Sequence, residues 1–283
     1  MRARFVTLAE GIEEVLRDND KVAFEGFTHL IPFAAAHEAI RQRRKNLELV
    51  RMTPDLIYDQ MIGCGMARRI VFSWCGNPGV GSLHRMRDAL ERQWPAPLEF
   101  EEHTHAGMAA AYDAGAANLP FGALRGYRGG DLARLNPNVR SVTCPFTNEQ
   151  LAAVPAMRLD AAIIHAQQAD EEGNVLIDGI IGVQKEAALC AKQVLVTVEE
   201  RVEAFRHSSP NACVLPSWTL SAIAVVPGGA FPSYAHGYYP RSNAFYVAWD
   251  KISRDRDSFN TWITTNVMRK GPEYFASYAR KTA

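Results

Sequence analysis

Residues 161–165 read Ala-Ala-Ile-Ile-His, an almost unbroken apolar run of the length of one β-strand. Two later runs have the same character: Val-Leu-Val-Thr-Val at 194–198 and Ala-Ile-Ala-Val-Val at 222–226. Continuous apolar strands are typical of parallel sheets that helices cover on both faces, because neither side of such a strand meets water. The three runs therefore predict the buried strands of an α/β protein.

The N-terminal half alternates strands and helices at an interval that suits parallel β-α-β units. Thr7 and Glu10 form a capping box before an amphipathic helix. The expected helices are 7–18, 33–43 and 82–93, and the expected strands are 21–25, 47–52 and 69–74. We expect one domain over residues 1–283, built on an open, mostly parallel, Rossmann-like sheet flanked by helices, with a helical C-terminal tail from about 243.

The composition argues against several classes of protein. Basic and acidic residues number 31 each, so the balance of charge gives no reason to expect nucleic acid or an anionic membrane as a partner. No stretch approaches the roughly 20 apolar residues that span a bilayer, and the N-terminus lacks the apolar stretch of a signal peptide. Five scattered cysteines without a C-x-x-C pair indicate reduced thiols in a cytoplasmic protein. His103 and His105 lack further ligands at a metal-binding spacing, so we expect no metal site.

Two glycine-containing turns follow expected strands. Gly26, Phe27 and Thr28 come after 21–25, and Asn77, Gly79 and Gly81 come after 69–74. Glycine lets the backbone approach a ligand closely, and ligands of open parallel sheets bind beyond the carboxyl ends of the strands. Ser82 is expected to cap the following helix, whose free N–H groups suit a carboxylate or phosphate. The alternative is that these glycines serve only the turns.

Several polar side chains also lie at expected strand ends. Glu25 is either a solvated strand end or a charge in a subunit cleft, and the cleft is favoured because buried charges need partners. Glu102 and His105 follow a short strand and could tune protonation near neutral pH, or form a solvated loop. Gln167 and Gln168 close the run at 161–166 and could bind a substrate carboxylate or the neighbouring loop.

His165 is different, because it lies inside an apolar strand. We expect it to be a core histidine whose ring nitrogens are hydrogen-bonded within the protein.

The ordered set of segments resembles the alpha subunits of family I coenzyme A transferases, in particular the glutaconate CoA-transferase branch. The segments are 20–28, 76–85, 115–121, 160–169 with 173–175, and 227–233, and together they extend across about residues 7–240. Two positions depart from the family pattern: Glu25 replaces the first glycine of Gly-Gly-Phe, and Phe231 stands where relatives often have His. The Ser-Glu-Asn-Gly type motif that carries the family's catalytic glutamate on the beta subunit is absent, as it should be in an alpha subunit.

The resemblance implies the CoA-transferase fold and transfer of CoA between an acyl-CoA and a small carboxylic acid, through a glutamyl-CoA intermediate on a beta subunit. It implies an α2β2 or larger assembly, and CoA as a substrate without a permanently bound cofactor. Glu102 and His105 are the candidate catalytic residues of this chain. The candidate substrate-binding residues are Glu25, Gly26, Phe27, Thr28, Asn77, Gly79, Gly81, Ser82, Gln167 and Gln168.

Two other functions are left open. The first is that of a subunit of a hydrolase that cleaves a C–C bond in a ring-containing acyl-CoA. Such a hydrolase would use the same scaffold, with water in place of the acceptor acid. A non-catalytic ligand-sensing domain would need no second chain.

Overall fold

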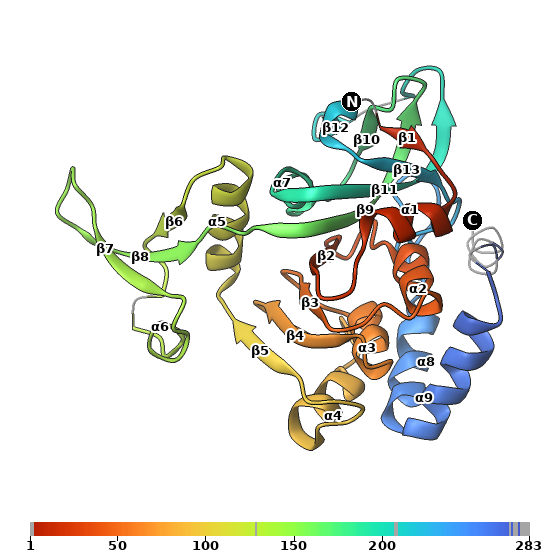
Figure 1. Ribbon diagram of the computed structural model, residues 1–283, viewed down its shortest axis with the longest axis horizontal. Helices are drawn as coiled ribbons and strands as arrows, with labels where there is room; N and C mark the ends of the chain where they lie inside the picture. Colours follow the sequence, from red (N-terminus) through yellow and green to blue (C-terminus); the bar gives the residue numbers. More distant parts are fainter. Residues whose placement is uncertain (1–2, 128, 207–208, 272, 274–276, 278–283) are drawn as a thin grey trace.

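The computed structural model describes residues 3–127, 129–206, 209–271, 273 and 277. Parallel strands form the spine of the main sheet, in the order β1-β13-β11-β9-β2-β3-β4-β5 (Figure 1). Their bounds are β1 (Arg4–Phe5), β13 (Ala222–Val225), β11 (Ala191–Val202), β9 (Leu159–Asp170), β2 (Lys21–Glu25), β3 (Leu47–Val50), β4 (Ala67–Phe72) and β5 (Glu99–Glu102). Two short strands, β10 (Val175–Ile177) and β12 (Cys213–Leu215), add an antiparallel extension beside β9. The parallel sheet expected from the apolar runs is therefore confirmed.

The strand order reverses between β2 and β9. The chain leaves β2 toward β3 on one side, whereas it leaves β9 toward β11 on the other. The two strands pair in parallel, with Glu25, the last residue of β2, opposite Ile164 in the middle of β9. Loops that leave neighbouring strands in opposite directions open a crevice, which is where ligands bind in open α/β sheets.

Helices cover both faces of the sheet (Figure 1). One face packs against α1 (Leu8–Val15), α2 (Phe33–Arg41), α3 (Leu56–Gly63) and α4 (His84–Arg92), with α8 (Asn243–Arg254) and α9 (Arg256–Ile263) completing the core on that face. The other face packs against α5 (His105–Ala116) and α7 (Gln184–Leu189). Successive residues of β2 go to opposite faces: Phe24 joins the first core and Ala23 the second. This alternation explains why the strands are apolar throughout.

From 243 to 271 the chain is mostly helical, and most of the expected helical tail beyond 271 lies outside the described residues. Helices α8 and α9 continue into a π-helical turn, η2 (Thr264–Met268), and a 3-10 turn, η1 (Ser217–Thr219), precedes β13. Within the described ranges no helix is both long and apolar enough to cross a membrane.

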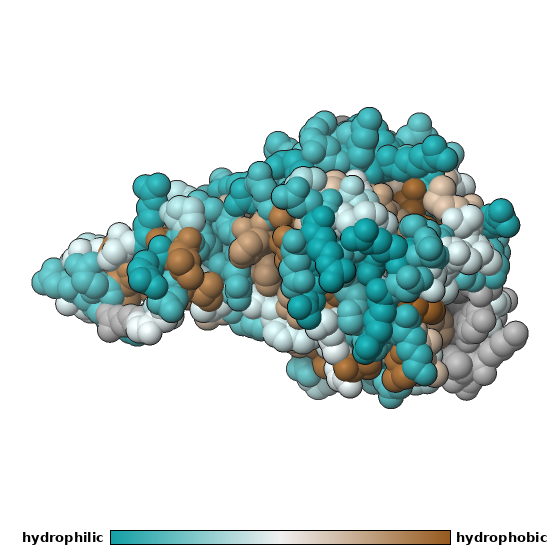
Figure 2. Space-filling model, turned by 90° about the horizontal axis from the view of Figure 1, so that it is seen from below, coloured by the Kyte–Doolittle hydropathy of each residue, from teal (hydrophilic) through white to brown (hydrophobic). Residues whose placement is uncertain are grey.

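An antiparallel arm, not expected from the sequence, projects from the body. It consists of β6 (Phe121–Leu124), β8 (Gln150–Pro155) and β7 (Arg140–Thr143), with the short helix α6 (Leu132–Leu135). Figure 2 shows it as a narrow projection from a broader body. Its exposed apolar side chains include Leu135 and Phe146, the latter 92% exposed.

The prediction that Ser82 caps helix α4 is wrong. The helix begins two residues after Ser82, and its N-cap residue makes no side-chain hydrogen bond to the helix. Instead the carboxylate of Asp59, on α3, accepts hydrogen bonds from the backbone N–H groups of Arg85 (2.8 Å) and Met86 (2.9 Å). Its other oxygen accepts from the indole Nε1 of Trp249 at 3.0 Å. A distant carboxylate thus satisfies the free N–H groups that a local serine was expected to satisfy.

Candidate functional site

The first cavity, of about 330 Å³, lies at the carboxyl edge of the sheet. Loops that follow β2, β3 and β4, and the start of α5 after β5, bring its lining together. The lining residues are Phe27, Thr28, Arg51, Thr53, Asp55, Trp74, Pro78 and His105. Among them are Phe27, Thr28 and His105, three of the residues that the sequence singled out, from segments far apart in the chain.

A buried charge cluster supports this cavity from below. Arg51 is fully buried and donates from Nη1 to Asp55 Oδ1 (2.9 Å) and from Nη2 to the carbonyl of Gly26 (2.6 Å). The Arg51 Nε lies 3.9 Å from Glu25 Oε1. Burial raises the pKa of both Glu25 and Asp55, while the Arg51 charge opposes this rise. One guanidinium therefore holds the ends of β2 and β3 together and stabilises two buried carboxylates.

Glu25 lies behind the cavity and does not line it. Its side chain is fully buried and accepts hydrogen bonds from Tyr112 Oη (3.1 Å) and from the backbone N–H groups of Gly26 (3.1 Å) and Met52 (3.5 Å). Gly26 is buried as well, and an added Cβ would stand 2.8 Å from the carbonyl oxygen of Leu30. Both residues thus shape the turn that carries Phe27, rather than presenting a group to the cavity.

The turn at residues 77–81 is anchored to the C-terminal helices. Asn77 is buried and donates from Nδ2 to the carbonyl of Tyr246 (2.8 Å), while Arg241 donates to the carbonyl of Pro78 (2.6 Å). Gly79 has φ +78°, so only glycine fits this position without strain. Gly81 has no such restriction, and its added Cβ would meet only Asp250 Oδ1, at 3.4 Å.

His105 is exposed and begins helix α5 at the cavity wall, whereas Glu102 is exposed at the end of β5 and is not among the lining residues. The acid–imidazole pair that the structure forms here is a different one, between Glu101 and His103 (Oε1 to Nε2, 2.7 Å). Burial would raise the pKa of Glu101, but hydrogen bonds from His103, Asn138 and Arg69, together with the charge of His103, lower it to about 2.

A second cavity, of about 460 Å³, lies on the other side of the crevice and is lined by Gln167 and Gln168. Gln167 donates to the carbonyl of Asp178 (2.7 Å) and accepts from its N–H (3.0 Å). Gln168 donates to Glu200 Oε1 (2.8 Å) and Tyr238 Oη (3.3 Å). Both amides are engaged by neighbouring segments, and their contact with a substrate stays a prediction.

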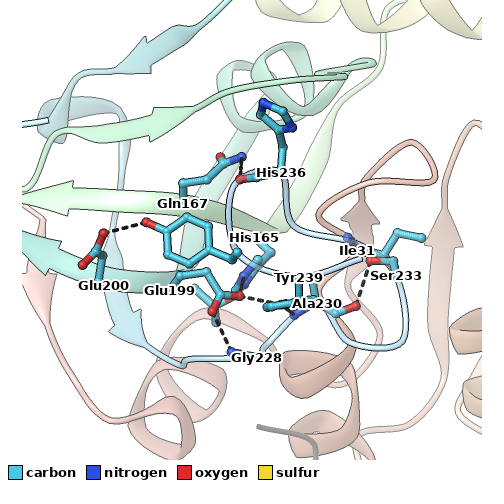
Figure 3. Close-up of polar contacts among 12 residues, drawn as sticks. Ile31, His165, Gln167, Glu199, Glu200, Gly228, Ala230, Ser233, His236 and Tyr239 are labelled. Atoms are coloured by element: carbon cyan, nitrogen blue, oxygen red, sulfur yellow. Dashed lines mark hydrogen bonds and ion pairs between the residues drawn. The ribbon is translucent and has the colours of Figure 1, made fainter. Parts of the chain in front are cut away.

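Next to the second cavity lies a buried polar network, part of which is drawn in Figure 3. His165 pairs through Nδ1 with Thr197 Oγ1 and through Nε2 with Glu199 Oε1, both at 2.8 Å. Glu199 also accepts from Tyr239 Oη (2.5 Å) and from the N–H of Gly228 (2.7 Å). A hydroxyl, an imidazole and a carboxylate in series have the order of a hydrolytic triad, but Thr197 and His165 are 0% exposed, so no substrate reaches them. The prediction of a core histidine is confirmed.

Sequence reasoning missed Arg51, Thr53, Asp55 and Trp74 in the first cavity. All of them follow β3 or β4, so the rule that ligands bind beyond strand ends could have nominated them. The sequence gives no sign that Arg51 is buried, because only the packing of loops from distant segments closes the cavity over it. Within the described ranges no group of three or more His, Cys, Asp or Glu side chains is arranged to hold a metal ion.

Comparison with known proteins gives concordant results. The family model described as coenzyme A transferase matches residues 5–225. The A-type subunit of the 3-oxoadipate CoA-transferase of Pseudomonas knackmussii is 58% identical over 281 residues, which cover 99% of each chain. The crystal structure of glutaconate coenzyme A-transferase from Acidaminococcus fermentans superimposes with a TM-score of 0.88 at 26% identity, covering 98% of this chain and 92% of that one.

A more distant relative bears on the hydrolase alternative. The cholesterol ring-cleaving hydrolase IpdA subunit of Rhodococcus jostii is 26% identical over 58% of this chain and 59% of its own length. The match to the 3-oxoadipate CoA-transferase chain is more than twice as identical and extends over both chains almost completely. Family match, sequence similarity and fold thus agree, and the chain belongs to the coenzyme A transferase family.

Proposed function

We propose that this member of the coenzyme A transferase family works with a B-type partner to transfer CoA between an acyl-CoA and 3-oxoadipate. The observation that carries the proposal is the 58% identity, over 99% of both chains, to a protein named as the A-type chain of a 3-oxoadipate CoA-transferase. Identity at this level across the whole length favours a common substrate class, here a small dicarboxylic acid.

The reaction needs a carboxylate nucleophile that this chain's sequence motifs do not supply, and we assign it to a glutamate of the partner. That carboxylate attacks the thioester carbonyl, and the oxyanion collapses with loss of CoA thiolate to leave a mixed anhydride. The thiolate then attacks the glutamyl carbonyl, which releases the first acid as its carboxylate and leaves glutamyl-CoA. The acceptor carboxylate reverses these steps, so that the glutamate is regenerated and the acceptor leaves as its CoA thioester.

This chain contributes the walls of the site. Phe27, Trp74 and Pro78 give the first cavity apolar surface that excludes water from a reacting thioester. Thr28 and His105 add polar groups, and the N-terminus of α5 places the positive end of a helix dipole beside the cavity. Preorganised donors of this kind stabilise a developing oxyanion, each typically by about 3–4 kcal/mol.

The Arg51 guanidinium is already engaged within the chain, which disfavours it as the anchor of a substrate carboxylate. Its two Nη atoms are bound to Asp55 and Gly26 within the chain. A free carboxylate of a dicarboxylic substrate is therefore assigned to the partner's side of the site. We propose an α2β2 or larger assembly with CoA as a substrate. We also propose a cytoplasmic location, because all five cysteines are free thiols and suit a reducing compartment.

Two alternatives receive less support. The hydrolase relative matches only part of this chain at low identity, and a ligand-sensing domain would have no reason to match a transferase chain along its whole length. Neither alternative is favoured.

The test uses this chain co-expressed with a B-type partner subunit. The complex should exchange CoA between the CoA thioester of a small dicarboxylic acid and 3-oxoadipate, and hydroxylamine should trap a glutamyl-CoA adduct on the partner. The isolated chain should be inactive. Turnover by the isolated chain, or an inactive complex that never forms the adduct, would refute the proposal.

A further inference from the structure

Three loops that bound the two cavities meet on one imidazole. His29 is 0% exposed and follows β2 at the reversal point of the sheet. Its Nδ1 lies 3.0 Å from the carbonyl oxygen of Ile180, in the loop after β10. Its Nε2 accepts a hydrogen bond from the backbone N–H of His236 at 3.0 Å, in the loop after β13. The ring also packs against Tyr234, with the ring centroids 4.5 Å apart.

The two contacts require one protonation state of the ring. The carbonyl of Ile180 can only accept, so Nδ1 carries the proton, and the N–H of His236 can only donate, so Nε2 is bare. Burial lowers the pKa of His29 to about 4, which keeps the ring neutral at physiological pH, although the hydrogen bond to Ile180 opposes this change. A neutral imidazole presents a donor and an acceptor on a rigid ring, and this is what joins the two loops.

His29 also lies between the linings of the two cavities. Its neighbours Phe27 and Thr28 line the first cavity, while Asp178 and His236 line the second. The backbone on either side of it is left-handed, with φ +58° at Thr28 and +51° at Leu30. Non-glycine residues keep such conformations only where the surroundings hold them. Fixing the imidazole therefore fixes the wall formed by Phe27 and Thr28.

We propose that His29 is a positioning residue for acyl transfer: by joining the loops after β2, β10 and β13 it holds Phe27 and Thr28 where the substrate binds. The inference rests on the proposed transferase function. Because His29 acts through the cavity wall and does not touch the reacting atoms, its loss affects the KM of the acyl-CoA more than kcat.

Two substitutions separate the two contacts. In His29→Asn the side-chain amide nitrogen takes the place of Nδ1 and keeps the bond to Ile180. In His29→Gln the amide oxygen takes the place of Nε2 and keeps the bond from His236. The matched control is His37, a histidine of α2 that is 1% exposed, lies outside both cavity linings and is hydrogen-bonded to Gln60 (2.6 Å). His37→Asn and His37→Gln report what the loss of a buried imidazole does by itself.

All variants are assayed in the complex with the B-type partner, alongside their urea unfolding midpoints. Both His29 variants should raise the KM of the acyl-CoA about tenfold and change kcat less than threefold, whereas the His37 variants should change neither parameter more than twofold. An unchanged KM in the His29 variants, a loss confined to kcat, or an equal change in the His37 variants would overturn the inference.

A milder probe decides the matter if the His29 variants do not fold. Gly179→Ala would place a Cβ 3.0 Å from the His29 Cε1, pressing on the imidazole from the β10 side. Gly173→Ala carries the same kind of backbone strain, with φ +83° against +103° at Gly179, but meets Ser217 and Ala3 instead. A raised KM in Gly179→Ala alone supports the positioning role, and equal or absent effects in the two variants overturn it. An inactive unmodified complex would overturn the proposed function and this inference together.

Discussion

The carboxylate of Asp59 offers a direct test of how this fold is held together. It is 0% exposed and accepts three hydrogen bonds, two from the first turn of α4 and one from the Trp249 indole. It therefore joins α3, α4 and α8. Burial raises its pKa from 3.8 to about 6, against the hydrogen bonds from Met86, Trp249 and Arg85 that lower it.

The direction of the pH effect follows from this pKa. The protonated form is favoured in the folded chain, so the contribution of Asp59 to stability is fully present below its unfolded pKa, near pH 4. It is lost as the pH rises through about 6. The difference between the two pKa values corresponds to about 3 kcal/mol of unfolding free energy. Asp59→Asn does not titrate. The stability of the unmodified chain relative to this variant should therefore fall by about 3 kcal/mol between about pH 4 and about pH 7.

The measurement is urea unfolding of both proteins, followed by tryptophan fluorescence across this pH range. Taking the difference between the two proteins removes the contributions of all other titrating groups. Asp255→Asn is the control, because Asp255 caps α9 from an exposed position and a hydrogen bond from the Ser258 backbone lowers its pKa. Its stability difference should change in the opposite direction. A difference for Asp59→Asn that stays constant, or that grows with pH, would show that the hydrogen bonds outweigh burial and would refute the reasoning.

Three further predictions concern the site and the assembly. Gly81→Val in the complex should lower turnover more than it lowers stability, because Pro78 of the same turn lines the first cavity while the added Cβ meets only Asp250 Oδ1, at 3.4 Å. Turnover within twofold would place the turn outside the site. Gly79→Val should instead lower the midpoint, since φ is +78° there. Glu102→Gln and His105→Ala, made separately, should each lower transferase turnover less than tenfold, which corresponds to about 1.4 kcal/mol of activation free energy. The partner's glutamyl-CoA adduct should still be trapped in both variants. Loss of both turnover and adduct would favour direct catalysis by this chain. In sedimentation, this chain and its partner should form a stable complex burying roughly 2,000 Å² or more; monomers in every mixture would contradict the expected association.

The antiparallel arm and the Glu101–His103 pair show where prediction from the sequence ends. Nothing in residues 121–155 has the continuous apolar pattern of the main sheet, because the arm strands are largely exposed and leave no strong period. The sequence places two acidic residues and two histidines after a short strand at 98–100, and only the family resemblance singles out Glu102 and His105 among them. Strand β5 instead continues to Glu102, and this brings Glu101 and His103 together.

The sequence by itself determined the parallel sheet, the helices that flank it and the edge at which the candidate site lies. Periodic burial is a local property: an apolar run such as 161–165 can be satisfied only by a covered strand, and the loops after parallel strands must share one edge. Only the tertiary structure decided which side chains meet at that edge. Arg51 beneath the cavity, Asp59 at the start of α4 and His29 between three loops all depend on the order of the strands. That order is set by the packing of the whole chain, and no local pattern encodes it.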